Sequence, residues 1–219
     1  MRLSASEKPR LIVIEGPAGV GKTTLTQHLS QRLAARGIST LALREFSDSP
    51  LGIALEDSSY YGQARPPWVL GVGGTVAFLA DKLKLLETAA EDRDTVYVSD
   101  RFVVTQLILG LRSVKGECEK KLTTDMISTA LAWIELTFSD DSIVVILEAD
   151  LQILRQRLEQ RVGRKLTTTE LRLLSDEICA YAGLEPNLVG WTRIKIHSTK
   201  PLESIASDLV SRILPIWKT

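Results

Sequence analysis

The stretch EGPAGVGKTT, residues 15–24, decides the fold of this chain. Residues 16–23 fit the pattern G-x-x-x-x-G-K-[ST], in which the backbone N–H groups of a glycine-rich turn surround a phosphate. The apolar run LIVIE, residues 11–15, precedes the pattern, and leucines at helical spacing follow it as far as Gly37. This order of strand, loop and helix predicts a working phosphate-binding loop.

The residue types of this loop suit a nucleoside triphosphate. Its glycines let successive N–H groups turn inward, and the start of the following helix adds a partial positive charge. We expect Lys22 to reach the β- and γ-phosphate oxygens and the Thr23 hydroxyl to bind Mg²⁺. The predicted site for ATP with Mg²⁺ consists of Gly16, Pro17, Ala18, Gly19, Val20, Gly21, Lys22, Thr23 and Thr24.

Four more strand-like runs alternate with helical patterns along the chain. The predicted strands are residues 11–15, 39–44, 95–100, 142–149 and 193–198. Helices are expected directly after the loop and at residues 74–91, 103–112, 122–138, 150–162, 168–182 and 201–216. This alternation predicts an α/β fold of the three-layer P-loop NTPase type, with a five-stranded parallel sheet and helices on both faces. Residues 57–74, rich in proline and glycine, are expected to form a loop near the ligand-binding edge of the sheet.

Length and composition limit the partners. A chain of 219 residues suits one domain spanning residues 1–219. Lys plus Arg and Asp plus Glu both total 27, so the chain lacks the net positive charge that holds proteins on nucleic acid or anionic membranes. We find no secretory leader or membrane span, and Cys118 and Cys179 lack metal-binding spacing. We expect a cytoplasmic protein with small-molecule partners, no nucleic acid and no membrane.

Five further motifs resemble those of the thymidylate kinases, in the same order and over nearly the whole chain. REFSDSPLG at 44–52 is similar to the acceptor loop of that family, and FLADK at 78–82 to its F-x-A-D/N-R helix segment. SDRF at 99–102 looks like the strand-end D-R-Y/F motif. LEADLQILRQRLEQR at 147–161 resembles a strand and its Arg-bearing helix, and STKPLESIASDL at 198–209 the closing turn and helix. The guanine-reading N-K-x-D of switch GTPases is not in the sequence.

The resemblance implies transfer of the ATP γ-phosphate to a small acceptor, a nucleotide, by a homodimer. Such a site needs several guanidinium groups to offset the repulsion between phosphates. The acceptor would be bound by Arg44, Glu45, Phe78, Lys82 and Arg101, with Glu45 serving either the metal or an arginine, and Phe78 either the base or the core. Asp100 would hold Mg²⁺ together with Thr23. Catalysis would use Lys22, Asp100, Arg101, Arg157 and Arg161, and a lid at about 161–168 would contribute Arg161 and Arg164.

The acceptor side departs from the family pattern. Ala18 replaces the acidic residue that holds the acceptor's sugar hydroxyl, and Lys82 replaces an arginine whose planar fork contacts the base. Phe46, Leu109 and Gly110 also stand where the family has other residues. Three functions stay open: a nucleoside-monophosphate or nucleoside kinase, a kinase of another small metabolite such as an antibiotic, and a non-catalytic nucleotide-binding regulator. The intact Lys22 favours the enzymes over the regulator.

Overall fold

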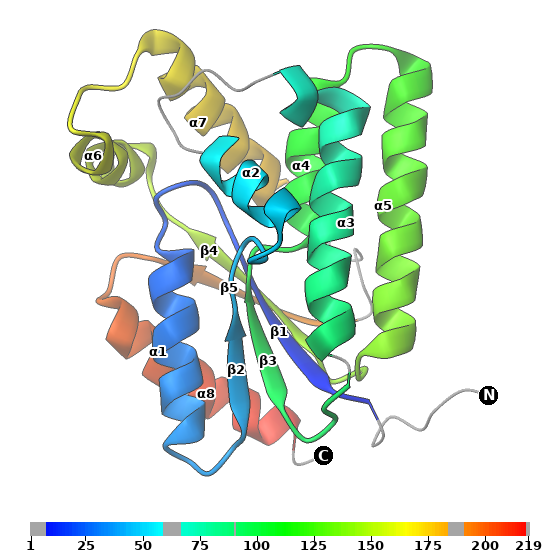
Figure 1. Cartoon of the computed structure of the whole chain (residues 1–219). Helices are drawn as coiled ribbons and strands as arrows, with labels where there is room; N and C mark the ends of the chain where they lie inside the picture. The colour runs from blue at the N-terminus through cyan, green and yellow to red at the C-terminus, as the bar shows by residue number, and fades with distance from the viewer. Residues whose placement is uncertain (1–7, 59–66, 90, 184–190, 218–219) are drawn as a thin grey trace.

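The computed structural model describes residues 8–58, 67–89, 91–183 and 191–217 of the 219-residue chain (Figure 1). Its centre is a five-stranded sheet in the order β2-β3-β1-β4-β5, and all neighbouring strands are parallel. The strands are β1 Arg10–Glu15, β2 Thr40–Leu43, β3 Val96–Asp100, β4 Ile143–Glu148 and β5 Thr192–His197. The predicted fold class is confirmed, because each strand falls at its predicted place.

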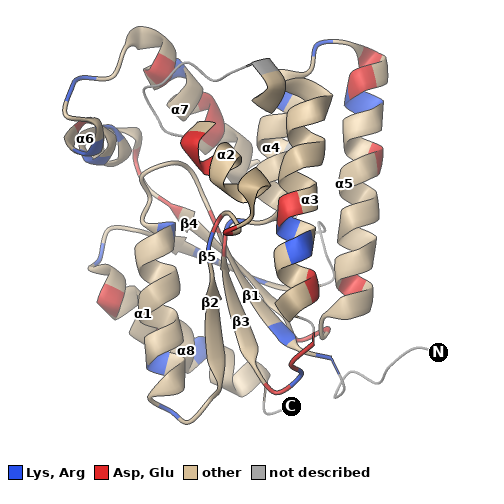
Figure 2. Cartoon of the chain, viewed as in Figure 1, with Lys and Arg blue, Asp and Glu red and all other residues tan. Residues whose placement is uncertain are grey.

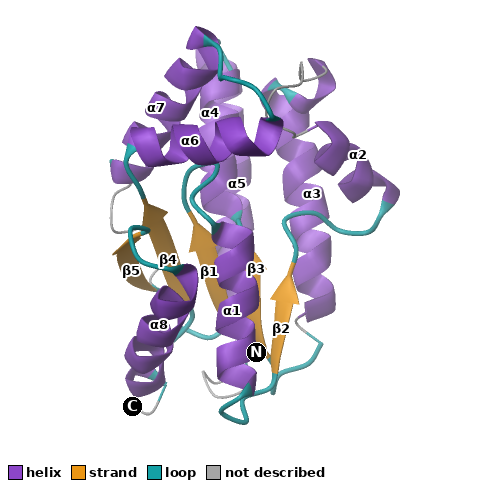
Figure 3. Cartoon of the chain, turned by 90° about the vertical axis from the view of Figure 1, so that its left-hand side faces the viewer, coloured by secondary structure: helices purple, strands orange, loops and turns teal. Residues whose placement is uncertain are grey.

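Helices cover both faces of the sheet. Helices α1 Lys22–Ala34 and α8 Leu202–Ile216 lie on one face, in front of the sheet in Figure 3. The other face carries α3 Gly71–Ala89, α4 Val103–Ser113 and α5 Glu117–Thr137. Helices α6 Leu151–Val162 and α7 Thr168–Ala182 lie beyond the carboxyl ends of the strands (Figure 3). Over the described ranges, none of the helices combines the length and the apolar character needed to cross a bilayer.

Side-chain alternation in the strands explains the three layers. In β1, Ile12 and Ile14 belong to the core shared with α1 and α8, whereas Leu11 and Val13 belong to the core shared with α3, α4 and α5. All four side chains are fully buried. A strand that is buried on both faces must be apolar at every position, which is why residues 11–14 form an uninterrupted apolar run.

The structure contains a helix that we did not predict, α2 Pro50–Ser58. Ser49 lies just before it, and the Ser49 hydroxyl accepts a hydrogen bond of 3.0 Å from the Gly52 N–H. A capping serine followed by proline at the first helical position is a recognised start signal. Our interpretation of residues 44–52 as an acceptor loop left this signal unused.

The predicted loop at residues 57–74 is wrong over most of its described part. Residues 59–66 lie outside the described ranges, but η2 Pro67–Val69 is a short 3₁₀ helix and α3 already begins at Gly71. Gly74 serves packing here, because a Cβ at this position would lie 2.2 Å from the Val69 carbonyl oxygen. A glycine is therefore required at position 74 because η2 packs closely against α3, and not because the chain must be flexible there.

A substitution pair tests the backbone of the phosphate loop. Gly16 has φ of +143°, and a Cβ there would lie 2.5 Å from the Leu147 carbonyl oxygen of β4, whereas Gly37 has φ of +77° and open space around it. We expect Gly16→Ala to lower the free energy of unfolding by about 2–5 kcal/mol through strain plus overlap. At position 37 an alanine would cause backbone strain but no overlap, so Gly37→Ala should lower the free energy of unfolding by about 1 kcal/mol. Urea denaturation of both variants measures the difference, and equal losses would contradict this explanation.

Candidate active site

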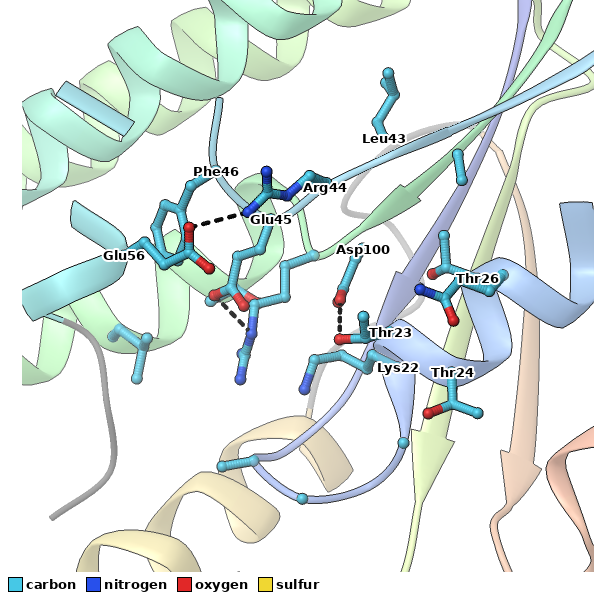
Figure 4. Close-up of a pocket in the computed structure, with 18 of the residues that line it drawn as sticks. Lys22, Thr23, Thr24, Thr26, Leu43, Arg44, Glu45, Phe46, Glu56 and Asp100 are labelled. Atoms are coloured by element: carbon cyan, nitrogen blue, oxygen red, sulfur yellow. Dashed lines mark hydrogen bonds and ion pairs between the residues drawn. The ribbon is translucent and has the colours of Figure 1, made fainter. Parts of the chain in front are cut away.

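A cavity of about 570 Å³ opens at the carboxyl edge of the sheet, beyond β1, β2 and β3 (Figure 4). The phosphate loop and the start of α1 form one wall, and the ends of β2 and β3 form another. The predicted residues that line it are Ala18, Gly19, Gly21, Lys22, Thr23, Thr24, Arg44, Glu45, Phe78, Asp100, Arg101, Arg157 and Arg161. The predicted residues that do not line it are Gly16, Pro17, Val20, Lys82 and Arg164. The structure therefore brings together donor-side and acceptor-side residues from five separate segments.

The phosphate loop carries its lysine in a buried position. The Lys22 ammonium donates hydrogen bonds of 2.9 Å to the carbonyl oxygens of Gly16 and Pro17. Burial lowers the pKa of Lys22 to about 8, and the nearby positive charge of Arg101 acts in the same direction. A phosphate would stabilise the ammonium form, so this lysine is suited to a polyanionic ligand.

Asp100 and Thr23 form a small oxygen-rich corner beside Lys22 (Figure 4). The Thr23 hydroxyl donates a hydrogen bond to Asp100 Oδ2, while Asp100 Oδ1 is buried and accepts no hydrogen bond within the described ranges. Hydroxyl and carboxylate oxygens are ligands that Mg²⁺ prefers. The donor set therefore fits the metal position that the sequence predicts.

Arg101 is the described residue with the least usual backbone. Its φ of 62° makes it the one non-glycine residue with positive φ in the described part of the chain. The Arg101 N–H donates to the Ile14 carbonyl oxygen at 3.0 Å, which fixes the end of β3 to β1. Strain of this kind costs about 1–2 kcal/mol and often occurs at functional sites.

The side chain of Arg101 lies among carboxylates. Its Nε lies 2.9 Å from Glu45 Oε1, and its Nη1 lies 3.8 Å from Glu177 Oε1. Burial alone lowers the pKa of Arg101, but the surrounding negative charges, Glu45 foremost, raise it overall. Glu45 thus pairs with Arg101, which is the second of the two roles that the sequence left open for it.

Arg44 is more exposed and is also paired. Its Nη1 donates to Asp48 at 2.7 Å and its Nη2 to Glu56 at 3.1 Å, the second contact reaching α2 (Figure 4). The side chain keeps 61% of its surface exposed, so these ion pairs contribute little stability. A ligand phosphate can therefore compete for Arg44 at small cost.

Lys82 does not line the main cavity but lines a small pocket that shares Glu45, Phe78 and Arg101 with it. Its ammonium donates to the carbonyl oxygens of Arg44 at 3.0 Å and Asp100 at 3.2 Å, and so ties the ends of β2 and β3 together. Burial lowers the pKa of Lys82. The described geometry gives this lysine a structural task, whereas the resemblance implied contact with the acceptor.

An aromatic pair forms the far side of the cavity. The Phe46 and Phe78 rings lie 5.5 Å apart and are tilted by 43°. Both line the cavity, together with Gln106 and Leu109 from α4. A flat apolar ligand group fits against this side, with Gln106 as a polar partner.

The three arginines around the predicted lid have different surroundings. Arg157 donates to the carbonyl oxygens of Val20 and Ser198, both at 3.3 Å, and so attaches the phosphate loop to the segment after β5. Arg164 pairs with Glu170, and hydrogen bonding from Arg164 lowers the pKa of Glu170 to about 2. Arg161 lines the cavity and makes no hydrogen bond or ion pair with the described residues. Of the three, Arg161 is the one whose charge is available to a ligand.

The segment after Arg164 begins α7 as the sequence predicts. The Thr167 hydroxyl accepts from the Glu170 N–H at 3.3 Å, and the Glu170 carboxylate accepts from the Thr167 N–H at 2.8 Å. This reciprocal pair is the predicted capping box.

Two acidic residues of the site were missed by our sequence analysis. Glu177 of α7 is buried and lines the cavity. Glu15 is fully buried at the end of β1, where Thr105 Oγ1 donates to it at 2.6 Å and Tyr181 Oη at 3.0 Å. Burial raises the pKa of Glu15, against the hydrogen bonds from Thr105 and the charge of Arg101. A signal for Glu177 was present, since it shares the helix face of the buried Leu174 and Tyr181, where a charged residue is unusual.

The fold and the site define a P-loop nucleotide-binding protein. The family described as "AAA domain" matches residues 12–173. The chain is 25% identical to the thymidylate kinase of Rhodopirellula baltica over 213 residues, covering 92% of this chain and 79% of that protein. It is 34% identical to the thymidylate kinase of Thermomicrobium roseum over 96 residues, or 44% of this chain and 45% of that protein. The solved structure of thymidylate kinase from Candida albicans matches with a TM-score of 0.61 at 18% identity, covering 95% and 92% of the two chains.

The chain belongs to the AAA domain family, whose model matches most of its length, and it is similar to thymidylate kinases. The likeness to the Candida albicans structure shows the fold alone, because the identity is low. The expected resemblance is thereby confirmed for the family and the fold.

Removal of the Lys82 ammonium tests its structural role. We expect Lys82→Met, which keeps the length of the side chain, to lower the free energy of unfolding by about 1–3 kcal/mol, because one buried and one part-buried carbonyl group lose their donor. Lys84→Met, on the exposed face of the same helix, should change it by less than about 0.5 kcal/mol. Thermal or urea unfolding measures both. If Lys82→Met keeps full stability but loses acceptor binding, the lysine serves the acceptor instead.

Proposed function

We propose that the chain transfers the γ-phosphate of ATP to a nucleoside monophosphate. The observation that carries this proposal is that one cavity is lined by two groups of residues. One group is the phosphate loop with Lys22 and Thr23, and the other is the pair of arginines, Arg44 and Arg101. The thymidylate kinase names of the similar proteins support the same reaction class. No covalent intermediate on the protein is needed, because the reaction is an in-line transfer that depends on positioning and charge neutralisation.

On the donor side, the phosphate loop binds the β-phosphate through its N–H groups. Lys22 exchanges the carbonyl oxygens of Gly16 and Pro17 for the β- and γ-phosphate oxygens. Mg²⁺, where bound, neutralises charge on these oxygens. Thr23 and the orphaned oxygen of Asp100 would hold it.

On the acceptor side, Arg44 and Arg101 orient the acceptor phosphate toward the donor. The Phe46 and Phe78 rings accept the base, and Gln106 is within the same part of the cavity. Arg101 is held at a strained backbone by its N–H bond to Ile14, so its guanidinium is preorganised and little entropy is lost on binding.

We assign the lid to residues 161–168, between α6 and α7. Arg161 would close over the transferring group and neutralise the charge that develops there. Arg157 would contribute indirectly, because it fixes the phosphate loop through Val20. Closure would also exclude water, which otherwise competes with the acceptor for the phosphoryl group.

A second candidate is phosphorylation of a hydroxyl group, as in a nucleoside kinase or a kinase of another small metabolite. The observation that favours it is the number of carboxylates on the acceptor side, where Arg44 contacts Asp48 and Glu56 and Arg101 contacts Glu45 and Glu177. Acidic residues are marked on both α2 and α7 in Figure 2. A neutral acceptor would enter such a site without electrostatic cost.

Two expectations about the setting belong to the same proposal. We place the protein in the cytoplasm on the basis of its composition, and we infer a homodimer from the family resemblance. Trp68, Leu70 and Val76, along η2 and α3, are all more than two-fifths exposed and support a helix-to-helix contact between copies. Sedimentation velocity of the wild type and Val76→Asp measures that association.

The release of ADP tests the proposed reaction. With ATP and Mg²⁺, we expect one nucleoside monophosphate from a panel of monophosphates and nucleosides to stimulate ADP release well above the background of Lys22→Ala. Loss of the Lys22 charge should lower kcat/KM by at least about 100-fold, because this group contacts the transferring phosphate. Stimulation by a nucleoside alone supports the second candidate. If neither monophosphates nor nucleosides stimulate ADP release although ATP still binds, the result contradicts nucleotide and nucleoside phosphorylation alike.

The lowered pKa of Lys22 predicts proton uptake on ATP binding. Since Lys22 has a pKa of about 8 in the free protein and phosphates raise it, the complex holds more protons than the free protein above pH 8. ATP affinity should therefore be constant at low pH and fall as the pH rises through 8. Calorimetric titrations at pH 8.5 in two buffers of different ionisation enthalpy should show uptake of roughly three-quarters of a proton. Lys22→Arg, which stays charged, should show none, and equal uptake by both would contradict the assignment.

A further inference from the structure

Glu177 is a buried carboxylate that the proposed mechanism leaves without a task. It lies on α7 between Leu174 and Tyr181, both almost fully buried, and its own side chain is only 7% exposed. It lines the cavity at the same time. Its carboxylate therefore reaches the binding site from the lid-side helix, not from the surface.

The carboxylate of Glu177 accepts no hydrogen bond from any residue in the described ranges. Its contact with Arg101 Nη1, at 3.8 Å, is an ion pair that is longer than a hydrogen bond. Arg101 is already paired with Glu45 at 2.9 Å, so it does not require Glu177 for neutrality. Because Glu177 lines the cavity, a ligand there can supply the hydrogen-bond donor that the described residues do not.

The location of Glu177 indicates which part of a ligand supplies this donor. A phosphate would be repelled by the carboxylate, and a flat base fits the aromatic side formed by Phe46 and Phe78. Glu177 comes instead from α7 and lies beside Arg101, which the proposed function assigns to the acceptor phosphate. In a nucleotide, the sugar joins the base to the phosphate, so the group next to Glu177 belongs to the sugar.

We infer that Glu177 accepts a hydrogen bond from a sugar hydroxyl of the acceptor and thereby determines which sugars the site takes. This inference rests on the proposed function, because it concerns the acceptor of that reaction. Glu177 contacts the bound acceptor and takes no proton from it in the transfer. Its contribution is selectivity, since a site that pairs a hydroxyl rejects the analogue that lacks it.

Kinetics with matched acceptors test the inference. The wild type, Glu177→Ala and Glu177→Asp are compared on the monophosphate that best stimulates ADP release and on its analogues that each lack one sugar hydroxyl. For the wild type we expect one analogue to lose roughly 10- to 100-fold in kcat/KM, the loss of one hydrogen bond to a charged group. On the acceptor that keeps every sugar hydroxyl, Glu177→Ala should lose the same factor in kcat/KM. On the analogue that lacks the critical hydroxyl, its kcat/KM should equal that of the wild type. Glu177→Asp should recover part of the difference.

The control is Asp176→Ala, on the same helix. Asp176 also pairs with an arginine, Arg112 at 3.3 Å, but it does not line the cavity, so its loss should leave the selectivity unchanged. ATP binding and thermal unfolding of each variant check that the fold persists. An equal loss on all acceptors, or no loss, overturns the inference while the kinase function stands. No ADP release by the wild type with any monophosphate overturns the proposed function and this inference with it.

Discussion

The buried guanidinium of Arg101 connects the parts of this molecule that must act together. Its backbone N–H fixes the end of β3 to β1, and its side chain contacts Glu45 after β2 and Glu177 on α7. Ordinary backbone geometry would point this side chain elsewhere, so the positive φ is part of the arrangement. The segment after β2, the strand β1 and the helix α7 are thus all connected through one charged residue.

Charge is distributed unequally between the two halves of the cavity. The phosphate loop half holds Lys22 with a lowered pKa, a group that gains stability from a polyanion. The acceptor half surrounds Arg44 and Arg101 with four carboxylates. Under the proposed function, strong attraction is reserved for the triphosphate, and the acceptor half would select ligands through shape and hydrogen bonding more than through net charge.

Local signals made much of this structure predictable from sequence. The phosphate loop, the five strands and the capping box of α7 each depend on neighbouring residues, and all were predicted. The start of α2 at Pro50 has a local signal too, but the family resemblance directed attention to a loop. The position of Lys82 had no such local signal, and for Glu177 the helix pattern indicated burial but not the cavity that it lines. Lys82 is turned inward because two strand ends offer carbonyl groups, and Glu177 faces the cavity because α7 packs across the sheet edge; both facts depend on residues distant in sequence.

The central claim is that the γ-phosphate of ATP goes to an acceptor in this cavity and not to water. Phosphorus NMR of a reaction containing ATP, Mg²⁺ and the stimulating monophosphate follows the fate of that group directly. We expect new signals of a nucleoside diphosphate derived from the acceptor, growing in step with ADP and absent with Lys22→Ala. Inorganic phosphate as the sole product besides ADP would contradict it.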